Sequence, residues 1–188
     1  MMNLKDIKST INMHYSEMYE INELKERRLY INSEIDDEVI DAKDRKPIIL
    51  YINSPGGSVY SGYALISAMQ CSKTPIYTVN QGMCASMAFL IFLAGNKRFS
   101  MLHSTFLMHD GSNGIGFESA SKLRDRIEYE TGQLEQHTKQ FVLSCTSIDD
   151  KFYDDKYRVE WYMLPHEAKE HSICDYIVGE DCDLDEII

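Results

Sequence analysis

Two hydrophobic patterns alternate through the first half of the chain: continuous apolar runs, and segments whose apolar residues recur every three or four positions. Residues 47–53 form a run of mainly apolar residues and predict a buried strand. Residues 59–70 carry apolar side chains at intervals of three and four, which predicts a helix packed on one face. Two further strands are predicted at 28–32 and 76–79, and a short helix at 36–43. This alternation indicates parallel strands joined by helical crossovers, and therefore an α/β fold.

The following segments continue the alternation. Residues 81–82, Gln-Gly, predict a turn that leads into a second helix from about 86 to 94. Residues 97–101 and 105–109 predict two more short strands, and residues 165–175 predict a short helix that leads into a last strand. The whole chain, 1–188, is therefore expected to form a single α/β domain.

A longer helix is predicted at residues 118–145. Leu123, Ile127, Leu134 and Phe141 recur there at helical intervals, and no proline interrupts them. At 1.5 Å per residue, roughly 28 residues reach about 42 Å, which is comparable with the diameter of a domain of this size. We therefore expect one end of this helix to project beyond its own core, where a partner subunit would cover it.

Composition and charge narrow the class of protein. With 188 residues, of which 44% are hydrophobic and 26% charged, the chain is typical of one soluble domain. A net charge of −11 argues against general binding to nucleic acid or to anionic membranes. The start lacks the apolar core of a signal peptide, and the longest apolar stretch, 85–94, is about half a membrane span. We expect a soluble protein.

The cysteines and the two ends of the chain add little specific chemistry. Five cysteines are widely spaced and contain no Cys-x-x-Cys pair, so neither a disulfide framework nor a zinc site is indicated, and a reducing cytoplasm fits best. We expect no cofactor and no metal. Residues 1–22 show no firm period and are interpreted as an arm, while residues 180–188 form an acidic tail.

Two segments each place one potentially catalytic side chain among small or apolar residues. Ser86 lies within 82–87, Gly-Met-Cys-Ala-Ser-Met, and His109 lies within 106–110, Phe-Leu-Met-His-Asp. A serine hydroxyl becomes a nucleophile when a positioned base takes its proton, and histidine is the usual base. Taken singly, each residue is more simply explained as structural, Ser86 as a helix cap and His109 as a structural histidine. Together they suggest acyl transfer.

Three ordered segments resemble the signature blocks of ClpP-type serine peptidases. They are residues 51–59, Tyr-Ile-Asn-Ser-Pro-Gly-Gly-Ser-Val, residues 82–88, Gly-Met-Cys-Ala-Ser-Met-Ala, and residues 107–109, Leu-Met-His. Their order and approximate spacing match the family, and similarity extends over most of the chain beyond the first two dozen residues. The resemblance implies a ClpP/crotonase-like fold of repeated ββα units with a projecting handle helix at 118–145.

The same resemblance assigns roles within the site. It implies Ser86 as the nucleophile and His109 as general base and then general acid. It also implies that the backbone N–H groups of Gly57 and Met87 form the oxyanion hole. The resemblance therefore implies a serine endopeptidase, which hydrolyses unfolded polypeptides or peptides through an acyl-enzyme intermediate.

The third member of the triad departs from the family pattern. Aligning Tyr162 and residues 167–168, Glu-Ala, places Glu160 where the family usually has an aspartate. Glutamate can orient a histidine, although its extra methylene requires a shifted backbone. Asp154 and Asp155 are the alternative acids, and Glu160 can also be read as a surface residue.

Assembly and partners follow from the resemblance alone. It implies homo-oligomeric, heptameric rings stacked in pairs as a tetradecamer through handle helices, with Leu134 or Phe141 as candidates for the contact between rings. Substrate would be delivered by an AAA+ unfoldase, because the chain has no Gly-x-x-x-x-Gly-Lys-Ser/Thr phosphate loop of its own. Residues 110–116 differ from the family's usual linker. Two other readings stay open, namely a catalytically silent ring subunit and a crotonase-like acyl-CoA enzyme.

Overall fold

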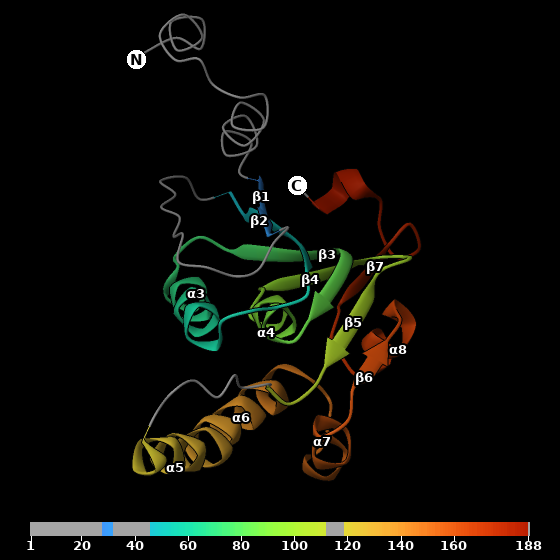
Figure 1. Ribbon diagram of the computed structural model, residues 1–188. Coiled ribbons are helices and arrows are strands. Elements are labelled where there is room, and N and C mark those ends of the chain that lie inside the picture. Colours follow the sequence, from blue (N-terminus) through green and yellow to red (C-terminus); the bar gives the residue numbers. More distant parts are fainter. Residues whose placement is uncertain (1–27, 32–45, 112–118, 188) are drawn as a thin grey trace, which may run out of the picture.

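Seven strands form one sheet within the residues that the computed structural model describes, 28–31, 46–111 and 119–187 (Figure 1). The strands are β1 (Arg28–Ile31), β2 (Ile48–Ser54), β3 (Ile76–Ala85), β4 (Lys97–Met101), β5 (Thr105–Met108), β6 (Trp161–Met163) and β7 (Tyr176–Val178). Their order is β1-β2-β3-β4-β7, with β5 paired to β3 and β6 paired to β5. The β5–β6 pair is antiparallel and the other pairs are parallel. The predicted α/β class is confirmed.

Strand β3 is longer than its sequence pattern predicts. The chain does not turn at Gln81 and Gly82 but stays extended to Ala85. Residues Tyr77 to Asn80 of β3 pair with β4, and residues Met83 to Ala85 pair with β5. The predicted turn was wrong because the strand changes partners near Gly82 without ending.

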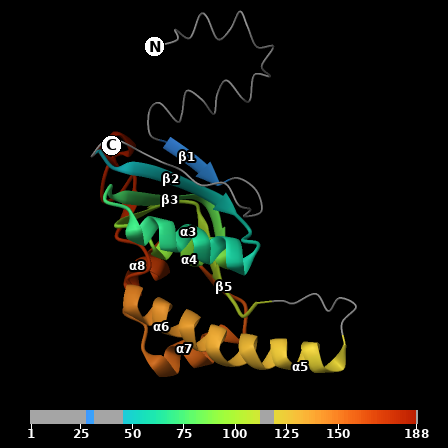
Figure 2. The same ribbon diagram turned by 90° about the vertical axis from the view of Figure 1, so that its left-hand side faces the viewer.

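Two helices pack between the sheet and the long helix (Figures 1 and 2). Helix α3 (Val59–Cys71) begins at Ser58, whose hydroxyl accepts the N–H of Ser61 at 3.3 Å. Helix α4 (Met87–Leu93) is buried at all seven of its residues, as its continuous apolar sequence requires. Together with β2, β5 and Val142 of the long helix, α3 and α4 enclose the main hydrophobic core.

The opposite face of the sheet carries a smaller apolar cluster. Ile49, Tyr51, Val79 and Phe99 are buried there, and Ile187 of a 3-10 helix (Leu184–Ile187) packs against them. The end of the predicted acidic tail therefore contributes an apolar residue to the core. Because both faces are covered, the strands read as continuous apolar runs rather than as alternating ones.

The predicted handle consists of three helical segments in direct succession. Helix α5 (Ala120–Tyr129) leads into a π-helical segment (Glu130–Leu134) and then into α6 (Glu135–Cys145), as Figures 1 and 2 show. No residue of α5 is buried, and Ile127 and Tyr129 are 45% and 43% exposed. The predicted long helix with one unburied end is therefore present, although its hydrogen bonding is not uniform.

Leu134 and Phe141 lie closer to the subunit's own core than the sequence suggested. Phe141 packs against the main core, and Leu134 lines a pocket beside α4. The apolar side chains that α5 leaves exposed are Ile127 and Tyr129. A role for Leu134 or Phe141 in a contact between rings stays a prediction.

Helix α7 (Asp150–Tyr157) and strand β6 were not predicted, whereas α8 (Pro165–Glu170) and β7 match the expected final helix and strand. The predicted helix at 36–43 and the arm at 1–22 lie outside the described residues. Among the helices that are described, none combines the length and the apolar character that crossing a membrane requires.

Candidate active site

Ser86 occupies a strained turn between β3 and α4. Its backbone has φ 55° and ψ −124°, a conformation that residues other than glycine rarely adopt. The Ser86 N–H donates to the carbonyl of Leu107 at 3.0 Å, and its carbonyl accepts the N–H of Phe89 at 3.0 Å. Ser86 is the N-cap residue of α4, as the helix-cap interpretation has it, but its side chain makes no capping hydrogen bond. The backbone is fixed while the hydroxyl is left for other chemistry.

The loop after β2 packs directly against this turn. Gly56 has φ +103°, and a Cβ there would lie 2.7 Å from both the Ala85 carbonyl oxygen and the Ser86 Cβ. The Gly56 N–H donates to the Ser54 hydroxyl at 3.2 Å, which holds the loop in place. Only glycine fits such an approach without displacing the turn that carries Ser86.

Replacing Gly56 with alanine should therefore damage both fold and site. The new methyl group would meet backbone atoms in a left-handed conformation, so we expect the free energy of unfolding to fall by at least about 2 kcal/mol. Thermal unfolding measures this loss, and reaction of Ser86 with a fluorophosphonate measures the loss of site geometry. An unchanged melting temperature with full labelling would contradict the close packing.

The two residues expected to form the oxyanion hole lie on either side of the contact between the loop after β2 and the turn that carries Ser86. Gly57 follows Gly56 in the β2 loop, and Met87 is the first residue of α4. The N–H groups in the first turn of a helix have no partner within the helix, so that of Met87 is available to an oxyanion. Gly57 and Met87 both line the same pocket as Ser86. Their role in binding an oxyanion stays a prediction.

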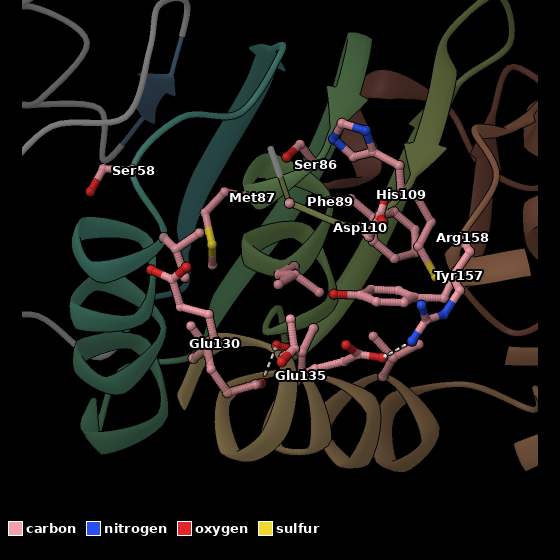
Figure 3. Close-up of a pocket in the computed structure, with 18 of the residues that line it drawn as sticks. Ser58, Ser86, Met87, Phe89, His109, Asp110, Glu130, Glu135, Tyr157 and Arg158 are labelled. Carbon is pink, nitrogen blue, oxygen red and sulfur yellow. Dashed lines mark hydrogen bonds and ion pairs between the residues drawn. The ribbon is translucent and has the colours of Figure 1, made fainter. Parts of the chain in front are cut away.

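His109 reaches the same pocket because two parallel strands end side by side. Ala85 of β3 pairs with Leu107 of β5, so Ser86 and His109 both lie just beyond that pair. Both side chains line a cavity of about 490 Å³, and Figure 3 shows them together at one end of it. Carboxyl ends of parallel strands are where the sites of α/β proteins gather.

Glu160 lies across from His109 because of the antiparallel β5–β6 pair. Met108 of β5 pairs with Trp161 of β6. Because the strands are antiparallel, His109, which follows Met108, lies opposite Glu160, which precedes Trp161. Glu160 Oε1 is 3.9 Å from His109 Nδ1, and Glu160 is 61% exposed. The Tyr162 hydroxyl donates to Glu160 Oε2 at 3.1 Å and raises its own pKa through this bond. The structure thus brings Glu160 to the histidine.

The three candidate side chains, Ser86, His109 and Glu160, lie near one another but are not joined by hydrogen bonds. A separation of 3.9 Å exceeds a hydrogen bond, although it is within ion-pair range. Within the described residues, no hydrogen bond joins the Ser86 hydroxyl to the His109 ring. Catalytic hydrogen bonds are often long before substrate binds and shorten in the complex.

The two alternative acids lie elsewhere. Asp154 accepts a hydrogen bond from Lys139 at 2.6 Å, and Lys139 also pairs with Asp150 at 3.1 Å. This bridge fastens α7 to α6. Asp155 is exposed on α7, and among the described contacts none joins it to His109. Of the three acidic candidates, the structure therefore brings Glu160 alone next to the histidine in the described chain.

Several pocket residues escaped the sequence analysis. Glu135, Thr138, Tyr153 and Tyr157 line the cavity from α6 and α7. The Asp110 N–H donates to the Tyr157 carbonyl at 2.8 Å, which ties the end of β5's chain to the end of α7. Tyr153 and Tyr157 are four residues apart, a spacing that places two side chains on the same face of a helix. The signal was missed because α7 itself was not predicted.

Among known proteins, the chain resembles Clp proteases and their proteolytic subunits. A family model described as Clp protease matches residues 12–181. The chain is 32% identical over 174 residues to the ATP-dependent Clp protease proteolytic subunit 2 of Thermobifida fusca, covering 86% of this chain and 85% of the relative. It is 30% identical over 175 residues to proteolytic subunit 2 of Nocardia farcinica, covering 83% and 82%. Proteolytic subunit 3 of Parasynechococcus marenigrum is 31% identical over 171 residues, covering 82% and 83%.

Proposed function

The chain belongs to the Clp protease family, and on that premise we propose that it is a serine endopeptidase that hydrolyses unfolded polypeptides or peptides. The observation that carries this proposal is the shared pocket of Ser86 and His109 at the ends of two adjacent parallel strands. A nucleophile and a base from separate segments meet there on a rigid sheet. Family membership also favours a peptidase over the acyl-CoA enzyme that the sequence left open.

The chemistry would proceed by acyl transfer. His109 takes the proton of the Ser86 hydroxyl as its oxygen attacks the scissile carbonyl, and a tetrahedral oxyanion forms. The N–H groups of Gly57 and Met87 bind that oxyanion. His109 then protonates the leaving amine, and a water activated by His109 releases the acyl group from Ser86.

Glu160 would support this cycle from the other side of the imidazole ring. From 3.9 Å, Glu160 would accept a hydrogen bond from the Nδ1–H of His109 as the two groups close up, which would direct the second nitrogen toward the hydroxyl and stabilise the imidazolium that forms. Because Glu160 is largely exposed, solvent screens this interaction, and its contribution is smaller than that of a buried acid.

We place this activity in the cytoplasm, inside a homo-oligomeric chamber of stacked heptameric rings that an AAA+ unfoldase supplies with substrate. The curated relatives are named as proteolytic subunits of ATP-dependent Clp proteases, which supports an ATPase partner. The unburied helix α5 supports assembly, because it leaves Ile127 and Tyr129 exposed on a projecting element.

Substituting Ile127 with glutamate should weaken this assembly. A charge in an apolar contact between subunits is desolvated without a partner, so we expect the native mass to shift from a large assembly toward single rings. Native mass spectrometry measures the shift. Ser121→Glu is the matched control, since Ser121 is a polar, exposed residue of the same helix. Equal masses for all three proteins would count against the placement of α5 between rings.

The proposed function is tested by the intact mass of the assembled protein after treatment with a fluorophosphonate. One adduct per subunit, absent from Ser86→Ala, would support an activated serine, and native mass recorded alongside would show the assembly in which it works. An intact ring without adduct would instead favour the silent-subunit reading. Affinity for coenzyme A without labelling would favour the acyl-CoA reading.

A further inference from the structure

The cavity beside Ser86 continues to a polar floor. Its walls are apolar near the nucleophile, where Met87, Phe89 and Leu90 line it. Its far end is lined by Glu135, Tyr153 and Tyr157 from α6 and α7. Figure 3 shows Ser86 and His109 at one end, with Tyr157 and Glu135 toward the other. A side chain that fills this cavity therefore meets apolar surface first and polar groups at its tip.

The floor contains a hydroxyl that has no partner. Tyr153 is 1% exposed, and its hydroxyl oxygen is buried without a hydrogen bond in the described structure. Its ring stacks on that of Tyr157 at a centroid distance of 5.0 Å, and Figure 3 shows the Tyr157 hydroxyl pointing into the pocket. A buried hydroxyl left unpaired is unfavourable, and because solvent does not reach it, the Tyr157 hydroxyl is the phenol of this pair that a bound group can meet.

The charge of the floor favours a bound group that donates hydrogen bonds. Asp110, Glu130 and Glu135 line the cavity, and Arg158 is the cationic residue among its described lining. Arg158 is bonded to Glu135 Oε1 at 3.4 Å and is 75% exposed, whereas Glu135 is 26% exposed. Glu135 therefore keeps acceptor capacity toward the cavity, and the local potential is negative.

The tyrosines remain neutral donors and acceptors in this setting. Desolvation by burial, with Glu135 adding to the effect, raises the pKa of Tyr157 to about 12 and raises that of Tyr153 further. Thr138 cannot serve in their place, because its hydroxyl donates to the Leu134 carbonyl and is shared with the Tyr63 hydroxyl at 2.7 Å.

From this arrangement we propose that the cavity selects a substrate residue with an apolar stem and a hydrogen-bond-donating head, such as glutamine or lysine. That residue is P1, whose carbonyl Ser86 attacks, because the cavity opens beside Ser86 and His109. Its stem contacts Met87 and Leu90, and its head bonds the Tyr157 hydroxyl and the Glu135 carboxylate. A purely aliphatic P1 side chain would cover these groups without bonding them, which costs affinity in the transition state. This inference rests on the proposed peptidase function.

The test compares peptides that differ only at P1, hydrolysed by the assembled protein. Glutamine is matched with methionine, and lysine with norleucine, so that each pair keeps nearly the same length with and without the polar head. We expect kcat/KM for glutamine or lysine to exceed that of its apolar match at least about tenfold. Preference for glutamine alone identifies a neutral donor, and preference for lysine shows that charge contributes; both support the proposal.

Variants connect the preference to the floor. Tyr157→Phe removes one hydroxyl and should reduce the polar-to-apolar ratio of kcat/KM about tenfold. Tyr153→Phe removes the buried, unpaired hydroxyl and is expected to fold at least as stably, but it should leave the ratio unchanged, because the bound head does not reach this group. Tyr77→Phe is the matched control, because Tyr77 packs against Phe99 with the cluster on the other face of the sheet. Its ratio should equal that of the wild type.

Two failures are distinguishable. Faster cleavage of the methionine and norleucine peptides, with Ser86 still labelled by fluorophosphonate, would overturn the polar-head inference and leave the peptidase intact. A ratio that Tyr157→Phe does not change would also overturn it. No hydrolysis of any of the four peptides, together with no adduct on Ser86, would instead reject the proposed function on which the inference rests.

Discussion

Alanine at Ser86 is expected to lower peptide turnover by about 10⁴-fold or more, while the protein still folds and assembles. Loss of the hydroxyl removes the acyl-enzyme route, and triad serines contribute effects of that order in other peptidases. The Ser86 side chain makes no capping bond to α4, so its removal takes away no structural hydrogen bond there. The measurement is hydrolysis of a fluorogenic peptide by wild type and variant at equal subunit concentration.

The control for this experiment is to show that wild type and Ser86→Ala fold and assemble alike. Equal native masses and equal melting temperatures for the two proteins would assign the lost turnover to chemistry. His109→Ala should show a similar loss, because serine and histidine act as one unit and their effects are not additive. Turnover retained by Ser86→Ala would contradict the assignment of Ser86 as the nucleophile.

Glu160→Gln is expected to lower turnover about 100-fold without changing the assembly. The amide keeps the shape of the side chain but loses the charge that stabilises the His109 imidazolium. The effect should be smaller than for Ser86, because Glu160 is 61% exposed and lies 3.9 Å from the ring. Steady-state kinetics should show the loss mainly in kcat, since substrate binding does not use Glu160.

Asp155→Asn provides the matched comparison for Glu160. It removes an exposed carboxylate from α7 that was an alternative candidate for the triad. Turnover should remain at the wild-type level in Asp155→Asn. If that variant loses activity and Glu160→Gln does not, the acid assignment moves from Glu160 to Asp155. Tyr162→Phe is informative beside them, because it releases the carboxylate oxygen that Tyr162 now holds at 3.1 Å.

The elements that carry strong patterns were predictable. Residues 59–70 have a clear helical period and became α3, and residues 97–101 became β4 with the predicted bounds. Helix α7 was missed because its sequence, Asp-Lys-Phe-Tyr-Asp-Asp-Lys-Tyr, is largely polar and has one buried residue, Tyr153. A weakly amphipathic helix of this kind is stabilised by packing and by the Lys139 bridge rather than by its own pattern.

The candidate site was predictable in its residues but not in its geometry. Motifs pointed to Ser86 and His109, yet their proximity depends on β3 extending past Gly82 to pair with β5. Glu160 was placed by alignment, and its position opposite His109 follows from the register of β6, a strand of three residues. Strand register depends on partners far away in sequence, which single-sequence patterns do not specify.

The π-helical segment at Glu130–Leu134 sets the rotational phase of the handle. The extra residue in a π-helical turn rotates the side chains of α5 about the helix axis by about 100° relative to their directions in a continuous α-helix. Deleting Gly132 would therefore point Ile127 in a different direction while leaving α6 in place. Glu130, Thr131 and Leu134 from the same segment also line the cavity beside Ser86. The same five residues therefore set both the direction of the exposed end of the handle and part of the wall of that cavity.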